Sequence, residues 1–89
     1  MAHGVVHALN GGLWLHQFDS RRERWAHLVS ADRAVLLVAG EALDMPERWL
    51  QYRPIKHPET GRREPAWHWD LKGDRLALAI RLADLREER

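Results

Sequence analysis

The 89-residue sequence contains no cysteine. This absence excludes disulfide bridges, thiolate zinc sites and thiol nucleophiles. No apolar run approaches the ~18 residues that a membrane-spanning helix needs, so we expect no membrane segment. The net charge is only +1, from 14 basic and 13 acidic residues. Bulk charge alone therefore predicts no polyanion-binding protein.

Several catalytic and nucleotide-binding motifs are also missing. The sequence has neither a Gly-x-x-x-x-Gly-Lys-Ser/Thr loop nor a Gly-x-Gly-x-x-Gly loop, which excludes nucleotide binding by those two devices. Its serines, Ser20 and Ser30, lie outside any nucleophile-elbow sequence, which argues against a serine hydrolase. The start of the chain lacks a basic segment followed by an apolar one, so we predict a cytoplasmic protein.

Tryptophan is plentiful by contrast, with five residues against one phenylalanine and one tyrosine. A chain of this length buries only about 60–65% of the surface that its unfolded form exposes, so its core must be thin. Large indole rings enlarge such a core. We expect Trp14, Trp25 and Trp49 to fill it, and self-association is a second way to cover apolar surface.

Local patterns predict three short strands and two helices. Apolar and aromatic runs indicate strands over 13–18, 25–29 and 66–70, and a charged turn joins the first two. An apolar stripe predicts a central helix over 32–43, with Ser30 or Asp32 as its N-cap and Pro46 beyond its end. Asp44 and Glu47 have the spacing of a capping box, which predicts a further helical turn.

The remaining segments are a loop and a C-terminal helix. Residues 53–65 contain three prolines and a glycine, and we interpret them as a long loop. In residues 71–89, alternating leucines would suit a strand, but alanines and terminal charges favour a helix, with Asp70 or Asp74 as its cap. We therefore predict a single small α/β domain over 13–89, or a mixed α+β one, with residues 1–12 as an N-terminal extension.

Three stretches carry a family resemblance. They are Trp25-Ala26-His27-Leu28-Val29 followed by Asp32, the run 39–51 that ends in Trp49-Leu50-Gln51, and His68-Trp69-Asp70-Leu71 before an alanine-rich segment. In this order they resemble an uncharacterised bacterial and phage domain family of unknown function. The resemblance implies a small mixed α/β domain with a C-terminal helix, and no known reaction. The family's first strand tends to end in aspartate, whereas His16 and Gln17 stand here.

The most informative candidate site combines His27, His68 and Asp70, with His16 as a further candidate. On a strand, His68 and Asp70 share one face, opposite Trp67 and Trp69. Two histidines and one carboxylate suffice for a catalytic divalent metal with open positions. The same groups could work without a metal, with a histidine as general base and Asp70 orienting it. The structural alternative is that Asp70 only caps the last helix.

A second candidate site is the basic loop and its aromatic flanks. Residues 48–63 hold five basic residues against one acid, Glu59. Its candidate binding residues are Arg53, Lys56, Arg62, Arg63, Trp67 and Trp69. Cations beside aromatic rings suit a phosphate group or a nucleic acid, whereas the alternative is a solvated loop.

The sequence favours a small soluble binding or interaction module, because tryptophan and arginine are enriched at interface hot spots. Its partner would be another protein or a second copy of the chain. The alternatives are a small metal-dependent or acid–base enzyme using His27, His68 and Asp70, and a phosphate or nucleic-acid binder using residues 48–63.

Overall fold

The computed structural model describes residues 2–87 and has a mixed α+β fold. In chain order, its elements are α1 (Ala2–Leu9), β1 (Trp14–Ser20), β2 (Glu23–Ser30), α2 (Arg33–Ala42), the 3-10 turn η1 (Glu47–Trp49), β3 (Gln51–Tyr52), β4 (Ile55–Lys56), β5 (Arg63–Glu64), β6 (Trp67–Lys72) and α3 (Gly73–Glu87). Four strands form an antiparallel sheet in the order β1-β2-β6-β3, and β4 pairs with β5 in a separate ribbon. The three predicted strands and both predicted helices are confirmed.

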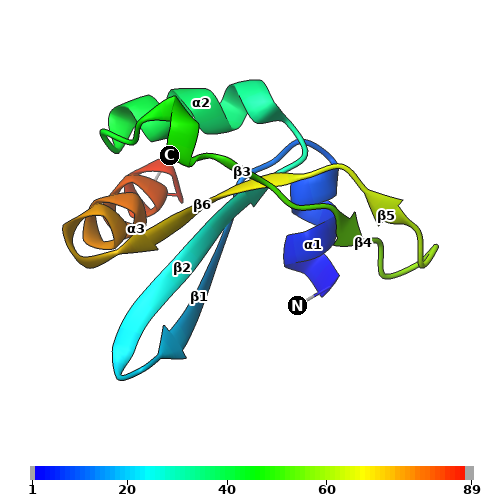
Figure 1. Ribbon diagram of the computed structural model, residues 1–89, viewed down its shortest axis with the longest axis horizontal. Coiled ribbons are helices and arrows are strands. Elements are labelled where there is room, and N and C mark those ends of the chain that lie inside the picture. The colour runs from blue at the N-terminus through cyan, green and yellow to red at the C-terminus, as the bar shows by residue number, and fades with distance from the viewer. Residues whose placement is uncertain (1, 88–89) are drawn as a thin grey trace.

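The two predicted helices lie on one side of the sheet (Figure 1). Helix α2 begins after Asp32, one of the two predicted N-caps. The Asp32 carboxylate accepts hydrogen bonds from the amides of Ala34 and Val35. Helix α3 follows β6 without a loop, and Gly73 makes this junction at a φ of +59°, a conformation that favours glycine. We call the side of the sheet under these helices the helix-covered face.

Trp69 is the centre of the core on the helix-covered face. It is completely buried, and its indole N–H donates to the carbonyl oxygen of Leu36 at 2.8 Å. Gly40 allows α2 to approach, because a Cβ at this position would meet the Trp69 ring at 2.3 Å. The rest of the buried cluster comes from β2, β6, α3, and α2 with its C-cap: Ala26, Leu28, Leu36, Leu43, Leu71, Leu76 and Ala79.

Several finer predictions need correction. Trp49, which we expected in the core, is 44% exposed, whereas Trp14 and Trp25 are half-buried. The predicted further helical turn exists as η1, but its N-cap is Pro46 and not Asp44. Residues 53–65, predicted to be a loop, include the β4–β5 ribbon, because Ile55 and Lys56 pair with Glu64 and Arg63.

Residues 1–12, predicted to be an N-terminal extension, include helix α1. Its residue Ala8 is fully buried against Val29 and Ala66. Val29 alternates with Leu28 along β2, so α1 covers one end of the sheet's other face. Figure 1 shows α1 apart from α2 and α3 and beside β4.

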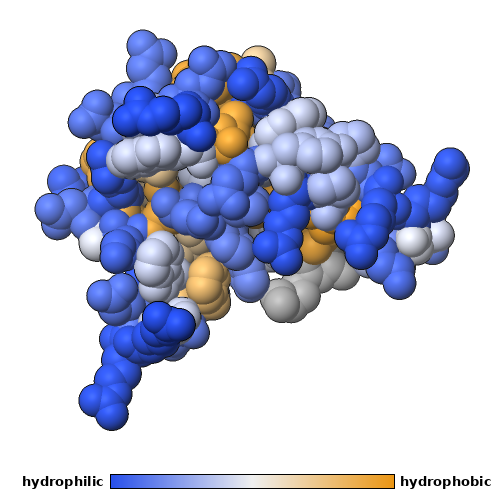
Figure 2. Space-filling view, viewed as in Figure 1, coloured by the Kyte–Doolittle hydropathy of each residue, from blue (hydrophilic) through white to orange (hydrophobic). Residues whose placement is uncertain are grey.

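The β1–β2 hairpin projects from the rest of the molecule (Figure 1). Its two turn residues, Arg21 and Arg22, both have positive φ, as a two-residue turn of this type requires. Figure 2 shows hydrophilic side chains at this tip, with apolar side chains visible only in patches between charged ones. In the part of the chain that the structure describes, no helix has both the length and the apolar character to cross a bilayer.

Candidate metal centre

The three residues of the first candidate site come together on the two central strands. His27 lies on β2, and His68 and Asp70 lie on β6. The antiparallel register places His27 directly opposite Asp70 and Val29 opposite His68. These side chains point away from the helix-covered face, because Trp69 between them points into it. We call their side of the sheet the histidine face.

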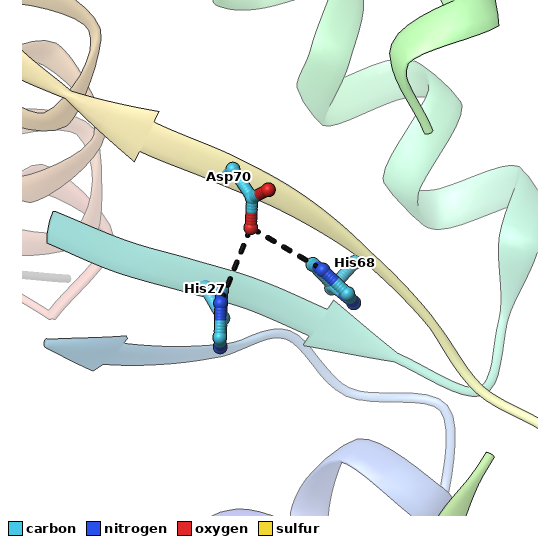
Figure 3. Close-up of side chains that lie close together, drawn as sticks. All are labelled: His27, His68 and Asp70. Atoms are coloured by element: carbon cyan, nitrogen blue, oxygen red, sulfur yellow. Dashed lines mark ion pairs between the residues drawn. The ribbon is translucent and has the colours of Figure 1, made fainter. Parts of the chain in front are cut away.

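The side chains converge on a single carboxylate oxygen. His27 Nε2 lies 3.2 Å from Asp70 Oδ1, and His68 Nε2 lies 3.3 Å from the same atom. The two imidazole rings are 4.6 Å apart between centroids and inclined by 49°. Figure 3 shows both rings turned toward the carboxylate from adjacent strands. The sequence predicted which residues meet, and the register explains why they do.

The structural alternative required Asp70 to cap the last helix, and Asp70 does not do so. It lies inside β6, and the strand continues through Lys72 before α3 begins. Its Oδ2 accepts a hydrogen bond from Gln51 Nε2 at 2.8 Å. Its Oδ1 is buried and accepts no well-aligned hydrogen bond, in spite of the two nearby imidazoles. The carboxylate is therefore held by one oxygen and left unsatisfied at the other.

Gln51 is the residue of the site that sequence reasoning missed. It lies on the two-residue strand β3, where it pairs with His68. A strand this short has no periodicity to detect. The only sequence signal for Gln51 is its place in the 39–51 stretch that carries the family resemblance, and that signal gave it no role.

The site is partly open to solvent. The His68 side chain is 6% exposed, whereas those of His27 and Asp70 are 32% and 39% exposed. Burial lowers the pKa of both histidines from the usual 6.5, and the nearby Asp70 carboxylate opposes this shift. The positive charge of Arg53 lowers both pKa values further.

Two of the spacings among the three candidate ligand atoms are compatible with a metal ion. Around a tetrahedral zinc with bonds of about 2.0–2.1 Å, ligand atoms lie about 3.3–3.4 Å apart. Both nitrogen–oxygen distances in the site are close to this value. One ligand atom from each of the three residues can be chosen so that all lie within 4.8 Å of one another.

His16, the further candidate, lies beside this cluster rather than in it. It is directly opposite His27 on β1, with 6.4 Å between ring centroids. Trp14 stacks on one side of His16 at 4.9 Å, and Phe18 lies 4.8 Å from His27. An aromatic row therefore extends across the histidine face from the metal-ligand candidates to the edge strand.

The residues of the basic loop are divided between the β4–β5 ribbon and the main sheet. Lys56 and Arg63 lie opposite each other on the β4–β5 ribbon, and Arg62 precedes β5. Trp67 packs edge-on against Tyr52 at 5.2 Å. Trp69 is fully buried and offers no surface to a ligand. Only Arg53 belongs with the histidine face, where its charge reaches both imidazoles.

Comparisons with known proteins returned no similarity on which to rest a function. No family model matches the sequence, and no curated protein and no solved structure matches it significantly.

Proposed function

We propose that the protein binds a divalent transition-metal ion through His27 Nε2, His68 Nε2 and Asp70 Oδ1. The observation that carries this proposal is the buried Asp70 Oδ1, which has no aligned hydrogen-bond donor although two imidazole nitrogens lie within 3.3 Å. A buried acceptor without a partner costs about 1–3 kcal/mol. A cation between the three atoms would remove this cost.

The arrangement of the two rings supports a metal over a simple ion pair. Both imidazole nitrogens lie at ion-pair distance from Oδ1, but neither is aligned for a hydrogen bond to it. Gln51 instead fixes the other oxygen, Oδ2, and so keeps Oδ1 directed at the histidines. This is the role of outer residues that orient a metal's ligands.

The ligand set is that of a catalytic rather than a structural site. Structural zinc sites have four protein ligands, whereas catalytic sites keep a position for water or substrate. Two histidines and one carboxylate also form the ligand set of non-haem iron enzymes. His27 and Asp70 are each about one-third exposed, so substrate could reach the ion. We therefore propose a small metal-dependent enzyme, with zinc, iron(II) or manganese as the candidate ions.

Two other functions of the protein are also proposed, each on a separate observation. Acid–base catalysis without a metal would use His27 as the base, with Asp70 at 3.2 Å to orient it. A protein-binding module would use the exposed rings of Trp49 and Tyr52, which are 44% and 58% exposed. The resemblance to an uncharacterised bacterial and phage family suits the binding role, and a cytoplasmic location suits all three.

Calorimetric titration of tag-free protein with zinc tests the metal proposal. We expect about one equivalent to bind to the wild type. Asp70→Asn and His68→Ala should each weaken binding by about 100-fold or more, because each removes one ligand. His7→Ala is the matched control, because His3 and His7 are four residues apart on α1 and could bind zinc adventitiously.

The variants separate the outcomes. Loss of binding in Asp70→Asn and His68→Ala with retention in His7→Ala supports the site. Absence of zinc binding in the wild type, together with no binding of iron(II) or manganese, contradicts it. Loss in His7→Ala alone would assign the binding to α1 and also contradict the proposal.

A further inference from the structure

Arg53 stands beside the proposed metal centre. It directly follows β3, and its amide donates to the carbonyl oxygen of Ala66 at 2.8 Å, which continues the pairing of β3 with β6 by one residue. Gln51, two residues earlier, already points toward Asp70. Alternation along an extended segment places Arg53 on the same face of the sheet, diagonal to His68.

The charge of Arg53 has no acidic partner among the side chains that the structure describes. Their ion pairs use Arg24, Arg33, Lys72 and the two histidines of the site, but not Arg53. Its side chain is exposed. By the register of β3 on β6, Arg53 is therefore an unpaired cation on the same face of the sheet as the ligand cluster.

A free cation beside a metal ion is unfavourable unless an anion lies between them. Asp70 is the only carboxylate in the ligand cluster, so a bound divalent ion and Arg53 together leave an excess of positive charge. A substrate oxygen carrying negative charge would satisfy both. Guanidinium groups bind phosphate by two parallel hydrogen bonds, and metal ions bind its oxygens directly.

We infer that Arg53 and the proposed metal ion together bind the phosphate group of a substrate on the histidine face. This inference rests on the proposed metal-binding function and names its substrate class. The aromatic row of Trp14, His16 and Phe18 extends from the same cluster along β1. Helix α1 packs on the Trp14 end of this row, where a Cβ at Gly4 would meet the indole ring at 2.2 Å. The rings of His16 and Phe18 therefore supply the surface on which a planar part of the substrate stacks.

The other basic residues serve as an internal comparison. Arg62 lies in the loop between β4 and β5, outside the pairing of β2 with β6 that builds the site. If basic charge in residues 48–63 acted collectively, as in nucleic-acid binding, Arg62 and Arg53 would contribute alike. A local phosphate site instead predicts that only Arg53 matters.

Titration of zinc-loaded protein with inorganic phosphate tests the inference. We expect Arg53→Ala to weaken phosphate binding by about tenfold or more, Arg53→Lys to give an intermediate value, and Arg62→Ala to match the wild type. Acetate should bind more weakly than phosphate. Zinc affinity, measured in the same variants, should be unchanged or slightly higher in Arg53→Ala because a repulsive charge is removed.

Each result distinguishes the two proposals. Zinc binding with equal phosphate affinity in wild type and Arg53→Ala overturns the inference but leaves the metal site intact. Equal losses in Arg53→Ala and Arg62→Ala overturn it in favour of a diffuse basic surface, and acetate binding as tight as phosphate overturns the assignment to phosphate. Absence of zinc binding overturns both proposals.

Discussion

The two faces of the central sheet are built from the same strands but differ in packing and in hydrogen bonding. Along β6, Trp69 and Leu71 are completely buried in the core with α2 and α3, and the indole N–H of Trp69 has a hydrogen-bond acceptor in Leu36. His68 and Asp70 alternate with them and lie on the histidine face, where a carboxylate oxygen is buried without an aligned partner. Hydrogen-bonding requirements are therefore met on the helix-covered face but not on the histidine face, where Asp70 Oδ1 lacks an aligned donor.

This difference separates residues that build the fold from the residues of the proposed metal centre. Apolar side chains on the helix-covered face lower the free energy of the folded state directly. The polar cluster on the histidine face carries an unsatisfied acceptor, so it does not contribute in this way. Substitutions on the helix-covered face should therefore mainly lower the free energy of unfolding. Substitutions in the cluster on the histidine face should mainly lower the affinity for zinc.

Trp69→Ala should have the largest effect on folding. Removing a fully buried indole leaves a cavity and should lower the free energy of unfolding by about 3–5 kcal/mol. Urea denaturation measures this loss. Trp49→Ala, at a tryptophan that is 44% exposed, is the matched control and should cost much less. Similar losses in the two variants would refute the assignment of Trp69 as the centre of the core.

Gly40→Ala should come next, with a loss of about 1–3 kcal/mol from overpacking. The added Cβ would meet Trp69 Cζ2 at 2.3 Å, so α2 or the indole must shift. Combining it with Trp69→Phe should make the two losses less than additive, because the smaller ring gives room. Additive losses in urea denaturation would show that Gly40 and Trp69 are not coupled.

Acid should destabilise the metal-free protein through the histidine face. Burial lowers the pKa of His27 and His68 below 6.5, Asp70 opposes this, and His16 and Arg53 contribute to the lowering at His27. The unfolded chain then binds more protons than the folded one as the pH falls below about 6.5. Stability is full above that value and is lost as the pH falls through the lowered pKa values.

Urea midpoints at about pH 5 and about pH 7.5 measure this dependence. The double variant His27→Gln/His68→Gln should flatten it, whereas His57→Gln, next to the β4–β5 ribbon, should keep the wild-type slope. A double variant as sensitive to acid as the wild type would place the effect elsewhere.

Asp70→Asn should have the smallest effect on folding, about 1 kcal/mol or less in either direction, because Oδ1 makes no aligned hydrogen bond to lose. The same variant should lose most of its zinc affinity. A large loss of stability in urea, comparable to that of Trp69→Ala, would show that the cluster is structural after all.

Local patterns were sufficient to predict much of the fold. The strand of β2, the stripe of α2 and the cap at Asp32 all follow from residues close in sequence. The same alternation placed His68 and Asp70 on one face. Sequence proximity to α3 was misleading for Asp70, because the strand continues to Lys72 and carries the carboxylate away from the helix start.

The rest depends on contacts between distant segments. The register of β2 on β6 places His27 opposite Asp70, and no local pattern determines it. Strand β3 has only two residues, so Gln51 could be found only through its pairing with His68. Helix α1 lacks any acidic residue in its first turn and is held by packing of Ala8 on Val29 and Ala66.

The most direct test of the central claim is a zinc titration followed by the side-chain nitrogen signals of the six histidines in nuclear magnetic resonance. The proposed site predicts that the Nε2 signals of His27 and His68 move together and saturate at one equivalent, while those of His16 and His57 stay in place. Signals that do not respond, or that respond first at His3 and His7, would contradict it.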